Sequence, residues 1–104
     1  MERFDQLLAT ITERRSADPA TSYVARLTAK GRAKIAQKLG EEAVEVVIAA
    51  MADDRAGLVS ESADLMFHLA VLLADAGLSF DDVRAELERR EGVSGLDEKA
   101  GRKS

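Results

Sequence analysis

Apolar residues recur along most of the chain at the three- and four-residue spacing of an amphipathic α-helix, and no stretch alternates like a β-strand. In the first expected helix, over about 2–15, one stripe holds Phe4, Leu7, Leu8 and Ile11. A short turn of helix is expected over 22–30, and longer helices over about 33–52, 55–76 and 80–91. The pattern therefore predicts an all-α protein.

Residues that break or cap helices separate these segments. Pro19, the sole proline, lies in the break after the first helix, and Gly31 and Gly77 suit the left-handed positions that end helices. Ser79 is a predicted N-cap, with Asp82 three residues later in a loose capping box. These residues thus mark several of the helix boundaries that the hydrophobic pattern predicts.

The length of 104 residues fits one domain, which we expect over 1–92. Apolar residues make up 46% and charged residues 33%, a balance typical of a globular protein. The last residues, 93–104, have almost no apolar content, and we expect them to form a mobile tail.

Charge and cysteine content exclude several classes of protein. The net charge of −4 argues against general binding to nucleic acid or to an anionic membrane. The absence of cysteine excludes disulfides, thiolate metal sites and cysteine nucleophiles. The first residues lack the apolar region of a secretory signal, and the apolar run 65–74 is short and interrupted by His68. We therefore expect a cytoplasmic protein with no nucleic-acid or membrane partner.

The helix over 33–52 places its charges unusually. On a helical wheel its charged residues fall within a sector of about 100°, and they are Lys34, Lys38, Glu41, Glu42 and Glu45. Most of the remaining circumference is apolar, so we expect this helix to be largely buried. Three carboxylates on the one polar strip of a buried helix favour a chemical role.

The next helix repeats the arrangement with Glu61, Asp64 and His68, within about 60° on the wheel. Antiparallel packing of the two helices would bring these carboxylates against Glu41, Glu42 and Glu45. Clustered carboxylates repel unless a cation neutralises them, and oxygen ligands without cysteine favour Mg²⁺ or Mn²⁺. The two helices together predict a divalent metal site.

Other interpretations of these charges stay open. A single acidic run is more often a solvated face, and His68 is either a packing residue or an outer partner of the site. A di-iron centre is not expected, because no Glu-x-x-His pair occurs in these helices. The basic residues at 30–38 would suit a polyphosphate or simply maintain solubility, and there is no P-loop.

The order Glu41-Glu42-x-x-Glu45 followed by Glu61-x-x-Asp64 resembles the all-α nucleoside-triphosphate pyrophosphohydrolases, the MazG-like superfamily. Within it, the stretches SYVARLTAKGRAKIAQKLGEEAVEVVIAA, LVSESADLMFHLAVLLADAGLS and FDDVRAELERR resemble the phosphoribosyl-ATP pyrophosphohydrolase family of histidine biosynthesis. The resemblance implies hydrolysis of phosphoribosyl-ATP to phosphoribosyl-AMP and pyrophosphate by metal-activated water.

The resemblance also implies site residues and an assembly. The implied metal ligands are Glu42, Glu45, Glu61 and Asp64, and the implied phosphate-binding residues are Lys30, Lys34 and Lys38. Glu41 is either a further ligand or the group that orients or deprotonates water, so Glu41, Glu42 and Glu45 are the catalytic candidates. The expected architecture is a four-helix-type bundle completed by homodimerisation. The alternatives are a housecleaning nucleotide pyrophosphohydrolase and, with less support, a non-enzymatic helical dimerisation module.

Overall fold

The computed structural model describes residues 2–91, which form five α-helices and no strand. The helices are α1 (Glu2–Arg14), α2 (Tyr23–Lys30), α3 (Arg32–Met51), α4 (Arg55–Asp75) and α5 (Phe80–Arg89). This confirms the all-α prediction, and the main helices end within two residues of the expected bounds. The domain end expected at residue 92 and the tail expected over 93–104 lie outside the described residues.

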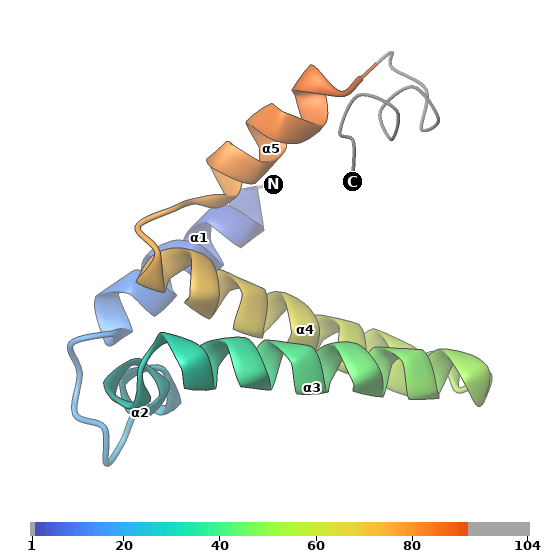
Figure 1. The fold of residues 1–104 in the computed structure, drawn as a ribbon, viewed down its shortest axis with the longest axis horizontal. Coiled ribbons are helices and arrows are strands. Elements are labelled where there is room, and N and C mark those ends of the chain that lie inside the picture. Colours follow the sequence, from blue (N-terminus) through green and yellow to red (C-terminus); the bar gives the residue numbers. More distant parts are fainter. Residues whose placement is uncertain (1, 92–104) are drawn as a thin grey trace.

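The two long helices, α3 and α4, form an antiparallel hairpin that runs the length of the molecule (Figure 1). The other three helices gather around one end of this hairpin, which we call its base. There α1 packs against α4, α2 leads directly into α3, and α5 contacts α1. The opposite end, the tip, consists of the end of α3, the connecting turn and the start of α4.

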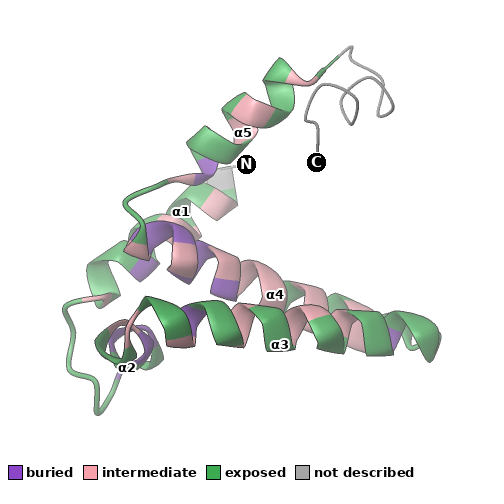
Figure 2. Ribbon diagram, viewed as in Figure 1, coloured by how far each residue is buried: buried purple, intermediate pink, exposed green. Residues whose placement is uncertain are grey.

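The hydrophobic core lies at the base of the hairpin, where all five helices contribute (Figure 2). Its buried members are Ile11, Val24, Leu27, Ile35, Ala70, Val71, Leu73, Ala74 and Phe80. The predicted stripe of the first helix is here, since Phe4, Leu7 and Leu8 pack against this cluster around the buried Ile11. The base therefore gives the hairpin a rigid anchor.

The tip of the hairpin differs from the sequence-based expectation. We expected the helix over 33–52 to be buried on most sides, but Val44, Val47 and Ile48 are each more than half exposed, and Met51 is 81% exposed. That expectation was wrong for the single chain, because α4 alone packs along this part of α3. The described chain contributes one long hairpin, and two such hairpins would be needed for a four-helix bundle.

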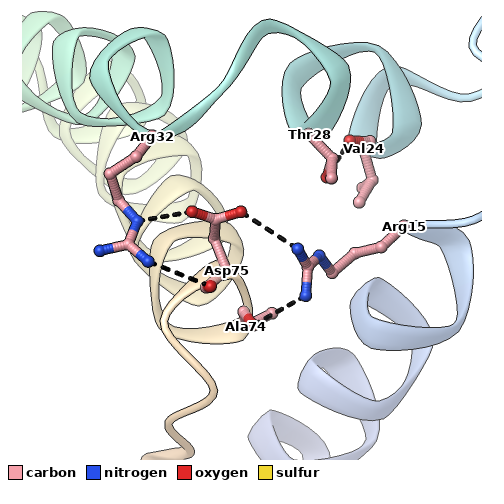
Figure 3. A network of polar contacts seen from close by, with 6 residues as sticks. All are labelled: Arg15, Val24, Thr28, Arg32, Ala74 and Asp75. Atoms are coloured by element: carbon pink, nitrogen blue, oxygen red, sulfur yellow. Dashed lines mark hydrogen bonds and ion pairs between the residues drawn. The ribbon is translucent and has the colours of Figure 1, made fainter.

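An arginine–aspartate network ties the base together (Figure 3). The carboxylate of Asp75, at the end of α4, accepts hydrogen bonds from Arg15 Nη2 at 3.1 Å and from Arg32 Nε at 2.5 Å. Arg15 also donates to the carbonyl oxygen of Ala74 at 3.0 Å, and Arg32 to that of Asp75 at 3.2 Å. The network fixes the residue after α1 and the first residue of α3 to the same end of α4.

Helix α4 is long and apolar enough, by length and composition alone, to cross a membrane. The central helix of a soluble protein meets the same criterion, and α4 packs against both α1 and α3. It also carries Glu61, Asp64 and His68 in its middle.

Candidate active site

The turn between α3 and α4 sets which side chains of the two helices face one another. Asp53 has a positive φ of 54°, and Asp54 caps α4 by accepting a hydrogen bond from the Gly57 N–H at 2.9 Å. A Cβ atom on Gly57 would lie 2.3 Å from the Asp54 carboxylate, so a larger residue there would have to displace this capping side chain. The tight turn holds the hairpin in register.

Three carboxylates meet between the facing sides of the hairpin. Glu42 of α3 and Glu61 and Asp64 of α4 each offer an oxygen atom, and these atoms lie within 4.8 Å of one another. We call this group the acidic cluster. Glu42 and Glu61 are half-buried and Asp64 is exposed, so the cluster opens to solvent on one side. Residues separated by about twenty positions in the sequence are brought together by antiparallel packing.

The electrostatic effect of this grouping is strongest at Glu61. Burial is the largest contribution to a raised pKa of this carboxyl group, and the negative charges of Asp64, Glu45 and Glu42 raise the pKa further. The ionised form of Glu61 is therefore disfavoured in the absence of a bound cation. A bound cation would remove this penalty.

The other two glutamates of the sequence prediction occupy different places. Glu45 is close enough for its charge to raise the pKa of Glu61, but it is exposed and lies outside the acidic cluster. Glu41 accepts a hydrogen bond from Gln37 Nε2 at 2.9 Å and pairs with Lys38 at 3.3 Å. The hydrogen bond from Gln37, followed by that from Lys38, lowers the pKa of Glu41.

The three predicted phosphate-binding lysines differ in how close they lie to the acidic cluster. Lys38 stands between Glu41, at 3.3 Å, and Glu42, at 3.9 Å, and its hydrogen bond with Glu41 raises its pKa. Lys34 is half-buried one turn earlier on α3, and its charge contributes to the lowered pKa of Glu41. Lys30 is exposed at the end of α2. The structure therefore places Lys38, and not Lys30, beside the acidic cluster.

His68 is buried and contacts the backbone of the cluster. Its Nδ1 atom lies 2.7 Å from the carbonyl oxygen of Asp64, and its Nε2 atom lies 2.9 Å from the hydroxyl of Tyr23. His68 therefore packs inside the fold, and its contact with Asp64 is to the backbone carbonyl and not to the carboxylate. Sequence reasoning missed Tyr23; its position directly after the N-cap Ser22 did not indicate that its hydroxyl reaches α4.

The donor set of the acidic cluster fits a hard divalent cation. All three groups supply carboxylate oxygens, on two helices held in register, and the charges of Asp64 and Glu42 add to the burial that raises the pKa of Glu61. Mg²⁺ and Mn²⁺ prefer oxygen ligands of this kind and keep open positions for water or phosphate. Among the described residues, this is the one group of three or more acidic or histidine side chains with such spacing.

Comparison with known proteins finds relatives that match almost the whole chain. Phosphoribosyl-ATP pyrophosphatase from Rhizorhabdus wittichii is 71% identical over 98 residues, covering 94% of this chain and 92% of the relative. The protein of the same name from Erythrobacter litoralis is 61% identical over 102 residues, covering 98% of both chains. That from Novosphingobium aromaticivorans is 63% identical over 97 residues, covering 93% of this chain and 91% of the relative.

The family profile matches just as broadly. The profile described as phosphoribosyl-ATP pyrophosphohydrolase matches residues 4–91, which include all five helices apart from the first two residues of α1. The match spans both helices of the hairpin and the whole acidic cluster. The chain therefore belongs to the phosphoribosyl-ATP pyrophosphohydrolase family.

Proposed function

We propose that this protein hydrolyses phosphoribosyl-ATP to phosphoribosyl-AMP and pyrophosphate, the second step of histidine biosynthesis. The observation that carries the proposal is the similarity of nearly the whole chain, at 53–71% identity, to proteins named phosphoribosyl-ATP pyrophosphatase. The acidic cluster on the α3–α4 hairpin supports the same reaction, because it provides oxygen ligands for a cation that binds phosphate.

The cation we propose is Mg²⁺, with Mn²⁺ as a possible substitute. Glu42, Glu61 and Asp64 would hold it, and Glu45, at the edge of the cluster, is proposed as a fourth ligand. When bound, such an ion neutralises phosphate charge and makes a coordinated water more acidic. Because Glu42 and Glu61 are half-buried, bulk water has limited access to the carboxylate oxygens that would hold the cation.

The basic residues beside the cluster are proposed to bind the triphosphate. Lys38 and Lys34 lie one turn apart on α3; Lys38 lies 3.9 Å from Glu42 of the acidic cluster, and the charge of Lys34 acts on Glu41. Lys38 would neutralise charge that develops on the leaving pyrophosphate. Lys30 lies at the end of α2, so we assign it the part of the phosphate chain farther from the cluster.

The three glutamates of α3 are proposed to have different roles. Hydrogen bonds from Gln37 and Lys38 lower the pKa of Glu41, which makes this carboxylate a weak proton acceptor. We therefore propose that Glu41 orients Lys38 and does not remove a proton from water. Glu42 and Glu45 then remain as the carboxylates that would accept the proton of the attacking water.

We further propose that the protein works as a homodimer in the cytoplasm. At the tip of the hairpin, Val44, Val47, Ile48 and Met51 form an exposed stripe with the three- and four-residue spacing of a helix–helix contact. A second copy of the hairpin packed on this stripe would complete a four-helix bundle and bury these side chains. The substrate is a small molecule, and we propose no nucleic-acid or membrane partner.

The test of the proposed function is a substrate panel with the purified protein and Mg²⁺. We expect rapid pyrophosphate release from phosphoribosyl-ATP and much slower release from dUTP and other nucleoside triphosphates. The opposite preference would identify a housecleaning enzyme. No hydrolysis of any of these, together with no thermal stabilisation by Mg²⁺, would identify a non-enzymatic helical module.

A further inference from the structure

Tyr23, which is exposed, and Phe67, which is half-buried, form an aromatic pair near the acidic cluster. Tyr23 begins α2 and Phe67 lies on α4, and their rings stack with centroids 6.1 Å apart and an interplanar angle of 24°. Tyr23, the sole tyrosine of the chain, keeps 41% of its surface exposed. Phe67 follows Asp64 by three residues, so the pair lies one helical turn from the cluster.

Hydrogen bonding fixes the direction of the Tyr23 hydroxyl. The carbonyl oxygen of Asp64 can only accept, so His68 Nδ1 carries the proton and donates to it at 2.7 Å. His68 Nε2 is then an acceptor, and the Tyr23 hydroxyl donates to it at 2.9 Å. The oxygen of Tyr23 is left able to accept a hydrogen bond from another group. His68 thus positions the Tyr23 ring relative to the backbone of Asp64.

The pair borders a cavity that the proposed metal and phosphate sites do not use. It has a volume of about 260 Å³ and lies between α1, α2 and α4. Tyr23 and Phe67 form its aromatic wall, Leu7 and Ile11 add apolar surface, and Arg14 and the hydroxyl-bearing Thr10 and Thr21 also line it. A space with aromatic walls, a few polar groups and one cation suits a heterocycle with its sugar better than a polyphosphate.

We propose that this cavity binds the purine and ribose end of the nucleotide, with Tyr23 and Phe67 as specificity-determining residues. The proposal rests on the function proposed above, because it assumes a nucleotide whose phosphates lie at the acidic cluster. Aromatic rings stack on nucleic-acid bases, and the acceptor oxygen of Tyr23 matches a ribose hydroxyl that donates.

The first test observes Tyr23 directly by NMR of protein labelled with ¹³C-tyrosine, which gives one ring spin system because the chain has one tyrosine. The protein is titrated in EDTA with AMP, and separately with ribose 5-phosphate and pyrophosphate, each to about 10 mM, enough to detect weak binding. We expect AMP to shift the Tyr23 ring signals and the two compounds without a base to leave them nearly unchanged. No shift with AMP, or equal shifts with all three, would overturn the proposal.

The second test compares Phe67→Leu with Phe4→Leu, which makes the same chemical change at another half-buried ring. Phe4 packs edge-on against Phe80 and does not line the cavity. We expect Phe67→Leu to raise KM for phosphoribosyl-ATP by about 10-fold, the scale of one lost base-stacking contact. kcat should be nearly unchanged, and Phe4→Leu should keep the wild-type KM. A KM for Phe67→Leu equal to that of the control would overturn the proposal.

The two tests also separate this proposal from the proposed function. If the wild-type protein hydrolyses phosphoribosyl-ATP but AMP leaves the Tyr23 ring signals unshifted, the proposed function stands and the proposed base-binding cavity is refuted. If AMP shifts the Tyr23 ring signals but the protein releases no pyrophosphate from phosphoribosyl-ATP, the nucleotide-binding cavity stands and the proposed function is refuted. Far-ultraviolet circular dichroism of both variants confirms that the helices remain folded.

Discussion

Asp75 accepts a hydrogen bond from Arg15, sixty positions earlier in the chain, at a distance of 3.1 Å. The Asp75 side chain is only 14% exposed, and the same carboxylate also binds Arg32 at the start of α3. A single carboxylate therefore joins α1, α3 and α4 at the base of the hairpin. This junction determines where α3 begins, and so where Lys34, Lys38 and Glu42 lie relative to α4.

Replacing Asp75 by alanine should destabilise the protein by about 1–3 kcal/mol, because two arginines lose a partly buried charged partner. The free energy of unfolding is measured by denaturant titration. Asp81→Ala is the matched control, since Asp81 pairs with Arg84 on the surface of α5 and should contribute about 0.5 kcal/mol or less. Equal losses in the two variants would contradict a special role for Asp75.

Replacing Asp64 by asparagine or Glu45 by glutamine should abolish turnover while leaving helical content intact. The loss should exceed the roughly 10- to 100-fold effect of removing even an outer partner of a metal ligand. Pyrophosphate release and circular dichroism are measured on the same samples, with Glu88→Gln on the exposed side of α5 as the control. Full activity of both site variants would remove the proposed metal centre.

Glu61→Gln should stabilise the cation-free protein at neutral pH. The folded state raises the pKa of Glu61 above its ordinary value of 4.5, so between these two pKa values the folded protein binds more protons than the unfolded protein. Stability therefore falls as pH rises through this range, and the ionised group is unfavourable at neutral pH. Glu61→Gln has no carboxyl group to ionise at this position, so its stability does not fall in this way. Thermal unfolding in EDTA from about pH 4 to about pH 7 should show an advantage of the variant that grows with pH.

The effect of Mg²⁺ on the melting temperature of the wild-type protein and of Glu61→Gln tests the same carboxylate as a cation ligand. Mg²⁺ should raise the melting temperature of the wild-type protein near neutral pH and have little effect on Glu61→Gln, because the variant lacks one proposed ligand. A variant that is less stable than wild type in EDTA, or that is stabilised equally by Mg²⁺, would contradict the electrostatic account of the cluster.

Val47→Asp should convert the proposed dimer into a monomer. Val47 is 59% exposed in the single chain and lies in the middle of the apolar stripe on α3, so a charge there would be buried without a partner in the dimer. The mass in solution is measured by light scattering. Val83→Asp on α5, where Val83 is 37% exposed, serves as the control and should keep the wild-type mass. A monomeric wild-type protein would refute the assembly itself.

Much of the fold was predictable from local patterns. The capping pair at the start of α5 forms as expected, since the Ser79 N–H donates to the Asp82 carboxylate at 2.9 Å. Gly31 ends α2 with a positive φ of 96°. These features depend on residues only a few positions apart, so the sequence pattern contains the information needed to place them. The burial of α3 was not predictable in this way, because the same apolar face can meet its own chain or a second copy.

The sequence by itself determined that the chain is helical, where its helices begin and end, and that its acidic residues lie on two successive helices. Only the tertiary structure decided that Glu42 joins Glu61 and Asp64, and that Tyr23 reaches His68. The physical reason is that helical periodicity fixes the direction of each side chain about its own axis. The register and rotation of one helix against another depend on the turn at 52–54 and on packing at the base, which join residues far apart in the chain.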